Sequence, residues 1–202
     1  MSDVLTIGHS NHPIETFFDR LAMAEVGTVV DVRSHPVSKW NPQFERSQLE
    51  TSLPAIGVPY RWAGQFLGGR PSGDHLIRDG MACYEAMAKE AHFERGVARV
   101  MDLAAETRPI LMCSERDPLD CHRCLLVSRR LIQLGARVSH IGFDGSVEDH
   151  AAAETRLLQV VEKSRGGKKA LADAQDPLQT AYRLRAARVA WKPKDDLDGE
   201  AR

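Results

Sequence analysis

Short apolar runs alternate with longer stretches of mixed polarity through the first 145 residues of the chain. An apolar run of about four to eight residues, bounded by polar or glycine positions, is typical of a buried strand. The run TVVDV at 28–32 is also rich in β-branched residues, which favour strands. Pro59 weakens one of the runs as a strand, because proline has no backbone N–H to donate. Strands are predicted at residues 4–9, 28–32, 58–62, 109–113 and 138–143.

Apolar residues recur at helical spacing between these runs, as they do at positions 14, 17, 18 and 21. Proline is well suited to the first turn of a helix, and glycine to the position just beyond its end. Helices are predicted at 13–26, starting at Pro13; at 47–56, ending at Gly57; at 81–106, interrupted near Gly96; and at 120–134, ending at Gly135.

Strand–helix–strand units repeated in this way predict a parallel sheet with helices on both faces. The expected fold class is α/β, a three-layer α/β/α architecture around a mainly parallel sheet of about five strands. Hydrophobic residues make up 43% of the chain and charged residues 27%, which suits a soluble globular domain. We assign this domain to residues 1–148, and residues 149–202 to a helical, basic C-terminal extension that is partly disordered.

The character of the sequence changes after Gly145. A peripheral helix is predicted at 150–162, a linker at 164–169 and a basic helix at 180–191. Nine Lys or Arg (positions 163, 165, 168, 169, 183, 185, 188, 192 and 194) stand against two aspartates in this part of the chain. The last eight residues are acidic and are predicted to be disordered.

Polar side chains follow each predicted strand. Ligands of parallel α/β sheets bind outside the carboxyl ends of the strands, where these side chains should converge. That convergence is the main functional signal of the sequence. The residues concerned are His9, Ser10 and Asn11 after the first strand, Asp31 and Arg33 at the second, Gly68, Gly69 and Arg70 after the third, the segment 111–124 after the fourth, and His140 in the fifth.

The segment LMCSERDPLDCHRC at 111–124 carries the densest chemistry. Asp120 is a good N-cap candidate, which puts Cys121 in the first helical turn. The positive helix end, His122 and Arg123 would all lower the pKa of that thiol and make it a nucleophile or a ligand. The alternative is a small buried residue at a helix start. Glu115 could orient a partner or act as a general base.

Two further interpretations of the cysteines stay open. Cys121 and Cys124 have the Cys-x-x-Cys spacing of dithiol enzymes, although Cys124 could instead face the core. Thiol and imidazole donors together suit zinc or iron. Cys113 could be one of the ligands, or it could be a buried thiol of the hydrophobic core. No specific zinc spacing is present, so no metal ligand is assigned, and zinc or iron stays an option.

The arginines indicate an anionic ligand. Arg33, Arg70 and Arg123 each follow a strand or start a helix, and arginine grips phosphate or carboxylate in a bidentate manner. Gly68 and Gly69 would allow a close backbone approach to such a ligand. A base could stack on the loop aromatics, which could equally form a satellite core. These aromatics are Trp40, Phe44, Trp62 and Phe66, interleaved with Lys39, Arg46 and Arg61.

Net charge and targeting signals limit the possible partners and cellular location of the protein. The net charge of −1 and the pI near 6.7 argue against a domain that binds nucleic acid with its whole surface. No apolar run reaches the roughly 20 residues of a membrane span, so no membrane contact is expected. The N-terminus lacks the basic and apolar regions of a signal peptide. We expect a cytoplasmic, reducing location, in which the four cysteines are thiols, ligands or catalytic groups.

Several motifs resemble one known family. They are TIGHSN at 6–11, DVRS at 31–34 followed by Pro36, QF at 43–44, LGG at 67–69, LMCSERDPLDCHR at 111–123 and HI at 140–141. In this order, over about residues 4–145, they resemble the family called domain of unknown function 488 (DUF488). The resemblance implies an α/β fold and no settled reaction, and Cys124 lies outside its pattern. Its signature positions here are His9, Ser10, Asn11, Asp31, Arg33, Gly68, Gly69, Cys113, Glu115, Cys121, His122 and Arg123.

The leading hypothesis is an enzyme, a hydrolase or transferase acting on a nucleotide, a nucleic-acid base or another phosphorylated compound. Two alternatives come from other classes: a non-catalytic nucleic-acid-binding protein that uses residues 163–194, and a metal-binding or thiol-redox protein. In the enzyme, the catalytic groups are Cys121, Glu115, His122 and His9, and the substrate- or anion-binding groups are Arg33, Arg123, Arg70, Asn11, Ser10, Asp31, Gly68 and Gly69.

Overall fold

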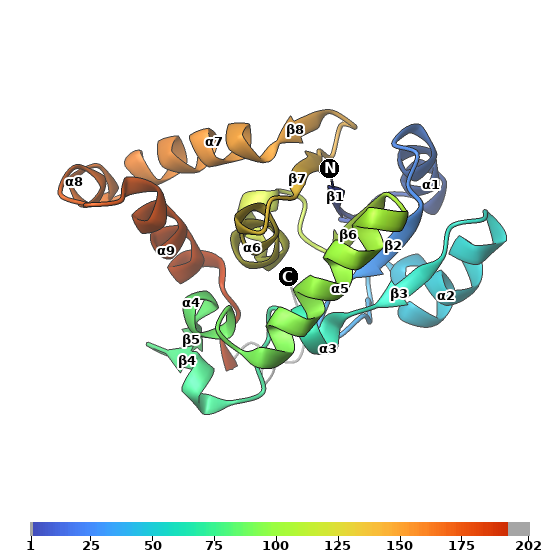
Figure 1. Ribbon diagram of the computed structural model, residues 1–202, viewed down its shortest axis with the longest axis horizontal. Helices are drawn as coiled ribbons and strands as arrows, with labels where there is room; N and C mark the ends of the chain where they lie inside the picture. Colours follow the sequence, from blue (N-terminus) through green and yellow to red (C-terminus); the bar gives the residue numbers. More distant parts are fainter. Residues whose placement is uncertain (1, 194–202) are drawn as a thin grey trace.

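The computed structural model describes residues 2–193, and a six-stranded sheet forms its centre (Figure 1). Its strands are β1 (Asp3–Gly8), β2 (Thr28–Asp31), β3 (Tyr60–Trp62), β6 (Pro109–Cys113), β7 (Arg137–Ile141) and β8 (Val147–Asp149). They lie side by side in the order β3-β2-β6-β1-β7-β8. Each neighbouring pair from β3 to β7 is parallel, and only β8 runs antiparallel, against β7. The predicted mainly parallel α/β sheet is confirmed.

Helices cover both faces of the sheet. They are α1 (Ile14–Met23), α2 (Arg46–Ala55), α3 (Gly64–Leu67), α4 (Tyr84–Met87), α5 (Ala91–Glu106), α6 (Arg129–Gln133), α7 (His150–Glu162), α8 (Gly167–Ala172) and α9 (Pro177–Val189). Short 3-10 turns lie at Pro42–Phe44, Asp74–Leu76 and Pro118–Asp120, and a π-helical turn at Arg123–Ser128.

The alternation of side chains along the strands creates two cores. Ile110 and Met112 of β6 pack on one face with residues of α1 and α2, such as Phe17. Leu111 and Cys113 point to the opposite face, where α5, α7 and α9 contribute. Successive strand residues point to opposite faces of a sheet, so β6 is buried on both sides. Figure 1 shows α1 and α2 at one end of the molecule and α7, α8 and α9 at the other.

Three short strands lie outside the predicted set. β8 is a short edge strand that gives no apolar run. β4 (Ile77–Arg78) and β5 (Met81–Ala82) form a separate antiparallel pair. Asp79 and Gly80 between them both have positive φ, 50° and 75°, as a tight hairpin turn requires.

The predicted helix at 81–106 is wrong in its continuity. Residues 81–82 are strand β5, and α4 and α5 follow as separate helices. Gly96, where an interruption was predicted, lies inside α5. A Cβ on Gly96 would lie 2.7 Å from a side-chain atom of Phe66 and 2.9 Å from one of Leu67, so the glycine lets α3 pack closely on α5.

The predicted start of the helix at 120–134 is also wrong. Asp120 ends the 3-10 turn, and the carboxylate of Asp117 accepts the Leu119 N–H at 2.9 Å instead. The carbonyl of Cys121 accepts the N–H groups of Cys124 and Leu125, each at 3.1 Å. Cys121 is therefore the residue from which the helical turns begin, rather than a residue within the first turn.

The C-terminal helices share the core of the sheet domain. The helix predicted at 150–162 is confirmed as α7, but α8 begins inside the predicted linker. Leu157 of α7 and Tyr182 of α9 are buried in the same hydrophobic cluster as Leu126. The acidic segment 195–202, predicted to be disordered, lies outside the described residues. Among the described helices, none combines the length and apolar character needed to cross a bilayer.

Candidate functional site

The carboxyl ends of β1, β2 and β6 bring the predicted side chains together. The His9 N–H donates to the Cys113 carbonyl at 2.8 Å, and the Ser10 N–H donates to the Ser114 carbonyl at 3.0 Å. On the other side of β6, the Val32 N–H donates to the Met112 carbonyl at 3.0 Å. Three segments that are far apart in the chain therefore meet at one edge of the sheet.

The Cys121 sulfur lies at the centre of this edge. Its Sγ is 2.9 Å from Oε2 of Glu115 and 3.8 Å from Nδ1 of His122, and it accepts the backbone N–H of Arg123 at 3.3 Å. Burial alone would raise the pKa of Cys121, but a hydrogen bond from Cys113 and the charges of Arg123 and His122 hold it well below the usual range. Cys121 is only 1% exposed, and of the two thiols Cys113 and Cys121 it is the one whose pKa is lowered.

Cys113 and Glu115 hold the protons around that thiolate. Burial and the neighbouring Cys121 raise the pKa of the Cys113 thiol. Loss of hydration and the charge of Cys121 raise the pKa of Glu115, a shift that water moderates because Glu115 is an exposed residue. The 2.9 Å contact between Cys121 Sγ and Glu115 Oε2 requires one proton between the two groups. The opposite directions of their pKa shifts favour the state in which the Glu115 carboxyl donates to the thiolate.

His122 is held with its ring between two segments. Nε2 lies 3.0 Å from the carbonyl of Val32, which only accepts, so this nitrogen carries a hydrogen. Nδ1 lies 3.8 Å from the sulfur of Cys113 and 3.8 Å from that of Cys121. Burial lowers the pKa of His122, but the Cys121 charge outweighs it and the net shift is upward. The ring is thus suited to form an imidazolium beside the thiolate.

Arg123 supplies a second buried positive charge. The residue has no exposed surface, and Nη1 donates to the Glu115 carbonyl at 2.7 Å. Its Nε has no hydrogen-bond partner among the described residues. The charge therefore acts on the internal anion Cys121, and the guanidinium itself does not reach the surface.

Arg33 and His9 form a second buried network beside the first. The Arg33 guanidinium donates to both carboxylate oxygens of Asp31, from Nε at 2.9 and 3.1 Å and from Nη2 at 2.6 Å, and to the Phe44 carbonyl at 2.8 Å. Its Nη1 lies 3.1 Å from His9 Nε2. The Tyr60 hydroxyl completes the network by donating to Asp31 at 2.7 Å. Protein groups thus occupy most of the hydrogen-bonding capacity of Arg33.

A family model described as "Domain of unknown function DUF488" matches residues 13–130, more than half of the chain. The chain belongs to the DUF488 family. No curated protein and no solved structure shows significant similarity to it. The DUF488 match includes Arg33 and the whole Cys113–Arg123 segment, whereas His9 precedes its first residue and α7, α8 and α9 follow its last.

His9 of this DUF488 protein is a buried, neutral imidazole. Nδ1–H donates to the Ser10 carbonyl at 2.8 Å, Nε2 accepts from Arg33, and the ring stacks on Phe44 with 4.3 Å between centroids. Burial, and then the Arg33 charge, lower the pKa of His9 from 6.5 to about 4. His9 is therefore a group that orients Arg33, with both ring nitrogens occupied by protein atoms.

The lowered pKa of His9 predicts that the folded protein loses stability in mild acid. The stability that neutral His9 contributes is complete above pH 6.5 and is lost as the pH falls to about 4, because only the unfolded chain takes up the proton. This loss amounts to about 3 kcal/mol at most. Urea unfolding of the wild type and His9→Gln between about pH 7 and about pH 4.5 should show a shallower pH slope in the variant. The same slope in both proteins would contradict the assignment, and His75→Gln, at an exposed histidine, is the control.

Gly68 and Gly69 make their close approaches to protein atoms. A Cβ on Gly69 would lie 2.8 Å from the His122 ring, and a Cβ on Gly68 would lie 2.3 Å from Oγ of Ser34. A Cβ at either distance would force its neighbour to move. Gly69 therefore lets the chain close over the imidazole that faces Cys121.

Gly69→Ala is expected to displace the His122 ring and weaken its pairing with the thiolate. The rate of Cys121 alkylation near pH 6 should fall several-fold, because less thiolate forms. Gly80→Ala is the control, since a Cβ there meets nothing within 4 Å although the backbone φ of 75° strains it. Equal alkylation rates in the two variants would show that the packing of Gly69 does not position His122.

Other predicted residues lie on the exposed rim of the site. Asn11 and Arg70 are exposed, and Ser10 is partly exposed with a φ of 46°. The Arg70 backbone N–H donates to Ser34 Oγ at 3.0 Å. Arg116, which is not among the predicted site residues, joins this rim with its guanidinium 3.6 Å from the centroid of the Phe143 ring. Its only sequence signal was its place within the segment 111–124.

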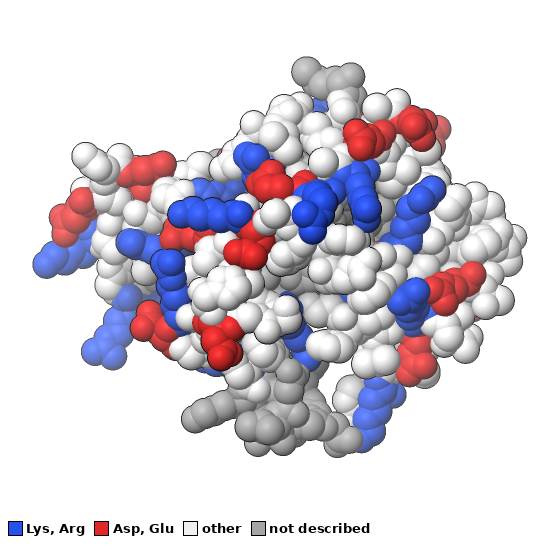
Figure 2. Space-filling view, turned by 60° about the horizontal axis from the view of Figure 1, so that its bottom comes forward, with Lys and Arg blue, Asp and Glu red and all other residues white. Residues whose placement is uncertain are grey.

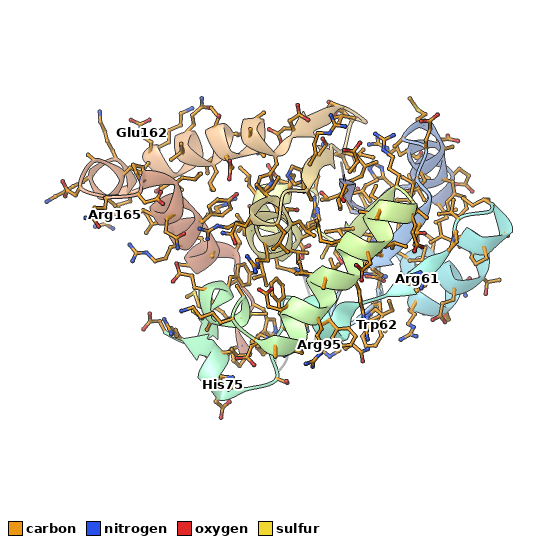
Figure 3. The ribbon with its side chains drawn as sticks, viewed as in Figure 1. Arg61, Trp62, His75, Arg95, Glu162 and Arg165 are labelled. Atoms are coloured by element: carbon orange, nitrogen blue, oxygen red, sulfur yellow. The ribbon has the colours of Figure 1, made fainter. Side chains whose placement is uncertain are left out.

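The loop aromatics do not form one stacking platform. Phe44 is fully buried, whereas Trp40 is 73% exposed. Trp62 donates its Nε1–H to the Arg33 carbonyl at 2.9 Å, so it supports the buried network. Figure 3 shows Trp62 right of centre in the view and Arg165 of the basic segment far to the left. Figure 2 shows Lys and Arg interspersed with Asp and Glu on the visible face, without one continuous basic surface.

A cavity of about 690 Å³ lies on the helical side of the cluster. Tyr84, Leu125 and Tyr182 line it, together with charged residues that include Arg129. Burial, followed by the charges of Cys121 and Glu115, raises the pKa of Tyr84. Tyr84 therefore lies near the thiolate cluster as well as in the cavity wall, a position that no sequence motif indicated.

Two groups of side chains among residues 2–193 could hold a metal ion. In each group the donor atoms lie within 4.8 Å of one another and the residues are buried. The first group is Cys113, Cys121 and His122, and the second is Cys124, His140 and His150. Thiolate and imidazole are donors that zinc accepts.

Proposed function

We propose that this DUF488 protein is an enzyme in which the Cys121 thiolate attacks an anionic substrate, a nucleotide or another phosphorylated compound. The observation that carries the proposal is the environment of one sulfur. Cys121 Sγ accepts a helix-start N–H, lies beside His122 Nδ1 and contacts the carboxyl of Glu115. Thiolates activated in this way by a cation and a helix N-terminus are typical of nucleophilic cysteines.

The residues define a two-step reaction. The thiolate forms a bond to the electrophilic atom of the substrate, and the bond to the leaving group breaks while Glu115 gives that group its proton. Glu115, now a carboxylate, then takes a proton from water or an acceptor hydroxyl, whose oxygen displaces the sulfur. The products leave, and Cys121 and Glu115 return to their starting states. This sequence is that of a hydrolase or a transferase.

The rim supports an anionic substrate. Arg70 and Arg116 are exposed arginines near the sheet edge, and Asn11 can donate and accept hydrogen bonds there. Arg123 and His122 stabilise the thiolate from the protein interior, so the substrate does not have to contact them. Arg33 and Asp31 hold the wall of the site through His9 and Phe44.

The thiolate is tested by alkylation with iodoacetamide, mapped by peptide mass spectrometry. From about pH 6 to about pH 8 the rate at Cys121 should change little, whereas an ordinary thiol gains about tenfold per pH unit. Cys83, which is partly exposed, is the internal control, and His122→Asn should move Cys121 towards ordinary behaviour. An ordinary pH profile at Cys121 would remove the thiolate mechanism.

The reaction is tested by incubating the protein with nucleotides and phosphorylated metabolites. Intact mass should reveal a substrate-derived adduct on Cys121 that accumulates in Glu115→Gln, since the second step needs the carboxylate. Cys121→Ser should give no adduct, and Cys83→Ser, at a cysteine outside the cluster, should behave as the wild type. Turnover that survives in Cys121→Ser would contradict the nucleophilic role.

A metal centre is the second candidate function at the same sulfur. It is favoured by the donor atoms of Cys113, Cys121 and His122, which lie within 4.8 Å of one another. A metal bound there would block alkylation of Cys121 until a chelator removed it. Elemental analysis and alkylation with and without chelator therefore separate the two functions. Nucleic-acid binding by residues 163–194 stays a prediction.

A further inference from the structure

A second buried cluster lies apart from Cys121 and takes no part in the proposed reaction. Cys124 comes from the π-helical turn, His140 from β7 and His150 from the first turn of α7. The three are between 1% and 3% exposed. Cys124 Sγ lies 3.9 Å from His140 Nε2, which lies 3.0 Å from His150 Nδ1. A π-helical turn within a helix often marks a functional site.

The two imidazoles turn one nitrogen inward and have the other held from outside. His140 Nδ1 is 2.8 Å from Oγ1 of Thr6 on β1. His150 Nε2 is 2.9 Å from the Tyr182 hydroxyl, which donates to Glu154 at 2.9 Å. Metal-ligating histidines almost always have such a partner on the other ring nitrogen, because it fixes the ring orientation.

The separations are close to those of a tetrahedral ion. Bonds of about 2.3 Å to sulfur and about 2.0–2.1 Å to nitrogen place sulfur and nitrogen about 3.6 Å apart, and two nitrogens about 3.3 Å apart. The observed distances are 3.9 Å from Cys124 to His140 and 3.0 Å from His140 to His150, and all three donor atoms lie within 4.8 Å of one another. Movements of a few tenths of an ångström at these contacts would admit the ion in place of the hydrogen bond between the two histidines.

Charge and access also suit a cation. The thiolate of Cys124 and the carboxylate of Glu154 would offset a charge of two. The nearby Arg156 is already paired with Asp117 and Glu148, at 2.8 Å each. Tyr182, whose hydroxyl lies 2.9 Å from His150 Nε2, also lines the cavity of about 690 Å³.

We propose that Cys124, His140 and His150 bind one divalent ion of the zinc type through one sulfur and two imidazole nitrogens. The ion joins α7 to the sheet and to the helix that follows Cys121. The family match ends at residue 130, so it contains Cys124 but neither His140 nor His150. The proposal is independent of the reaction at Cys121.

The test uses the full chain with Zn²⁺ or Co²⁺ alone, followed by dialysis and elemental analysis. We expect tight binding in the wild type and in Cys121→Ser, and a loss of at least tenfold in affinity in Cys124→Ser and His150→Gln. Zn²⁺ should also raise the unfolding temperature of the wild type and Cys121→Ser, but not that of Cys124→Ser. Binding that is lost in Cys121→Ser and kept in Cys124→Ser would overturn the proposal, as would no binding in the wild type.

The wild type alone also gives an answer, should the Cys124 variant fail to fold. X-ray absorption of the zinc-loaded protein distinguishes one sulfur with two imidazoles, which the proposal requires, from two sulfurs with one imidazole, which would place the ion at Cys113, Cys121 and His122. A protein that holds two ions should lose only one of them on Cys124→Ser. Loss of neither would refute the site.

Discussion

Replacing Arg123 with methionine is expected to lower the free energy of unfolding by about 3–5 kcal/mol, because removing one partner of a buried charge cluster leaves the other uncompensated. The guanidinium has no exposed surface, and it donates to the carbonyls of Glu115 at 2.7 Å and of Arg116 at 3.4 Å. It also lowers the pKa of Cys121, so the variant should alkylate at Cys121 more slowly near neutral pH. Urea unfolding measures the first effect, and peptide mass spectrometry the second.

The matched control for Arg123 is an arginine in an exposed ion pair. Arg137 is 63% exposed and pairs with Asp3 at 2.8 Å. Arg137→Met should cost at most about 1 kcal/mol, the usual range for surface pairs. Arg123→Lys keeps the charge but loses the forked donors, so its stability should fall between wild type and Arg123→Met. Equal losses for Arg123→Met and Arg137→Met would show that the buried charge does not hold the cluster together.

Asp31→Asn is expected to lower the free energy of unfolding by a similar amount, about 3–5 kcal/mol, because it leaves the Arg33 cation buried without its counter-charge. Asp31 has no exposed surface and Arg33 is 4% exposed. The carboxylate accepts from the Arg33 side chain and from the Tyr60 hydroxyl, so the change also weakens the contact with β3. Urea unfolding near neutral pH measures the effect, and Asp3→Asn in the exposed pair with Arg137 is the control.

A double-mutant cycle separates the pair from its surroundings. Arg33→Met in the Asp31→Asn background should recover part of the lost stability, because no unpaired charge then stays buried. Strict additivity of the two single losses would contradict the pairing. The same proteins should alkylate normally at Cys121 where they fold, since Arg33 and Asp31 form the wall of the site and do not set the charge of the sulfur.

The architecture follows from short-range patterns that survive in the fold. Runs such as 109–113 are apolar on both faces, so they have to become central strands, and β6 is indeed buried on both sides. Once the strands are parallel, their carboxyl ends share one edge, which is why His9, Arg33 and Cys113 could be expected together. The precise contacts were not predictable, because side-chain partners such as Val32 for His122 belong to distant segments.

Local signals failed where tertiary packing decided the backbone. Asp120 is a residue type that often caps helices, but the buried Arg123 and the turn at Pro118 place Cys121 at the helix start instead. Glycine often interrupts a helix, but Gly96 lies within α5, because the side chain of Phe66 packs where a Cβ of residue 96 would be. The edge strand β8 has one apolar residue in three and no periodic signal.

The sequence by itself determined the parallel sheet, the helices between its strands and the gathering of thiol, imidazole and guanidinium groups at one edge. These follow from hydrophobic periodicity and chain connectivity, which act over a few residues and leave a visible pattern. Only the tertiary structure decided which of the two thiols, Cys113 or Cys121, has the lowered pKa. It also decided that Arg33 and Arg123 interact with buried groups of the protein, and that Cys124 lies beside His140 and His150. Charge states depend on burial and on neighbours brought together by folding, and these are not written in any local stretch of the chain.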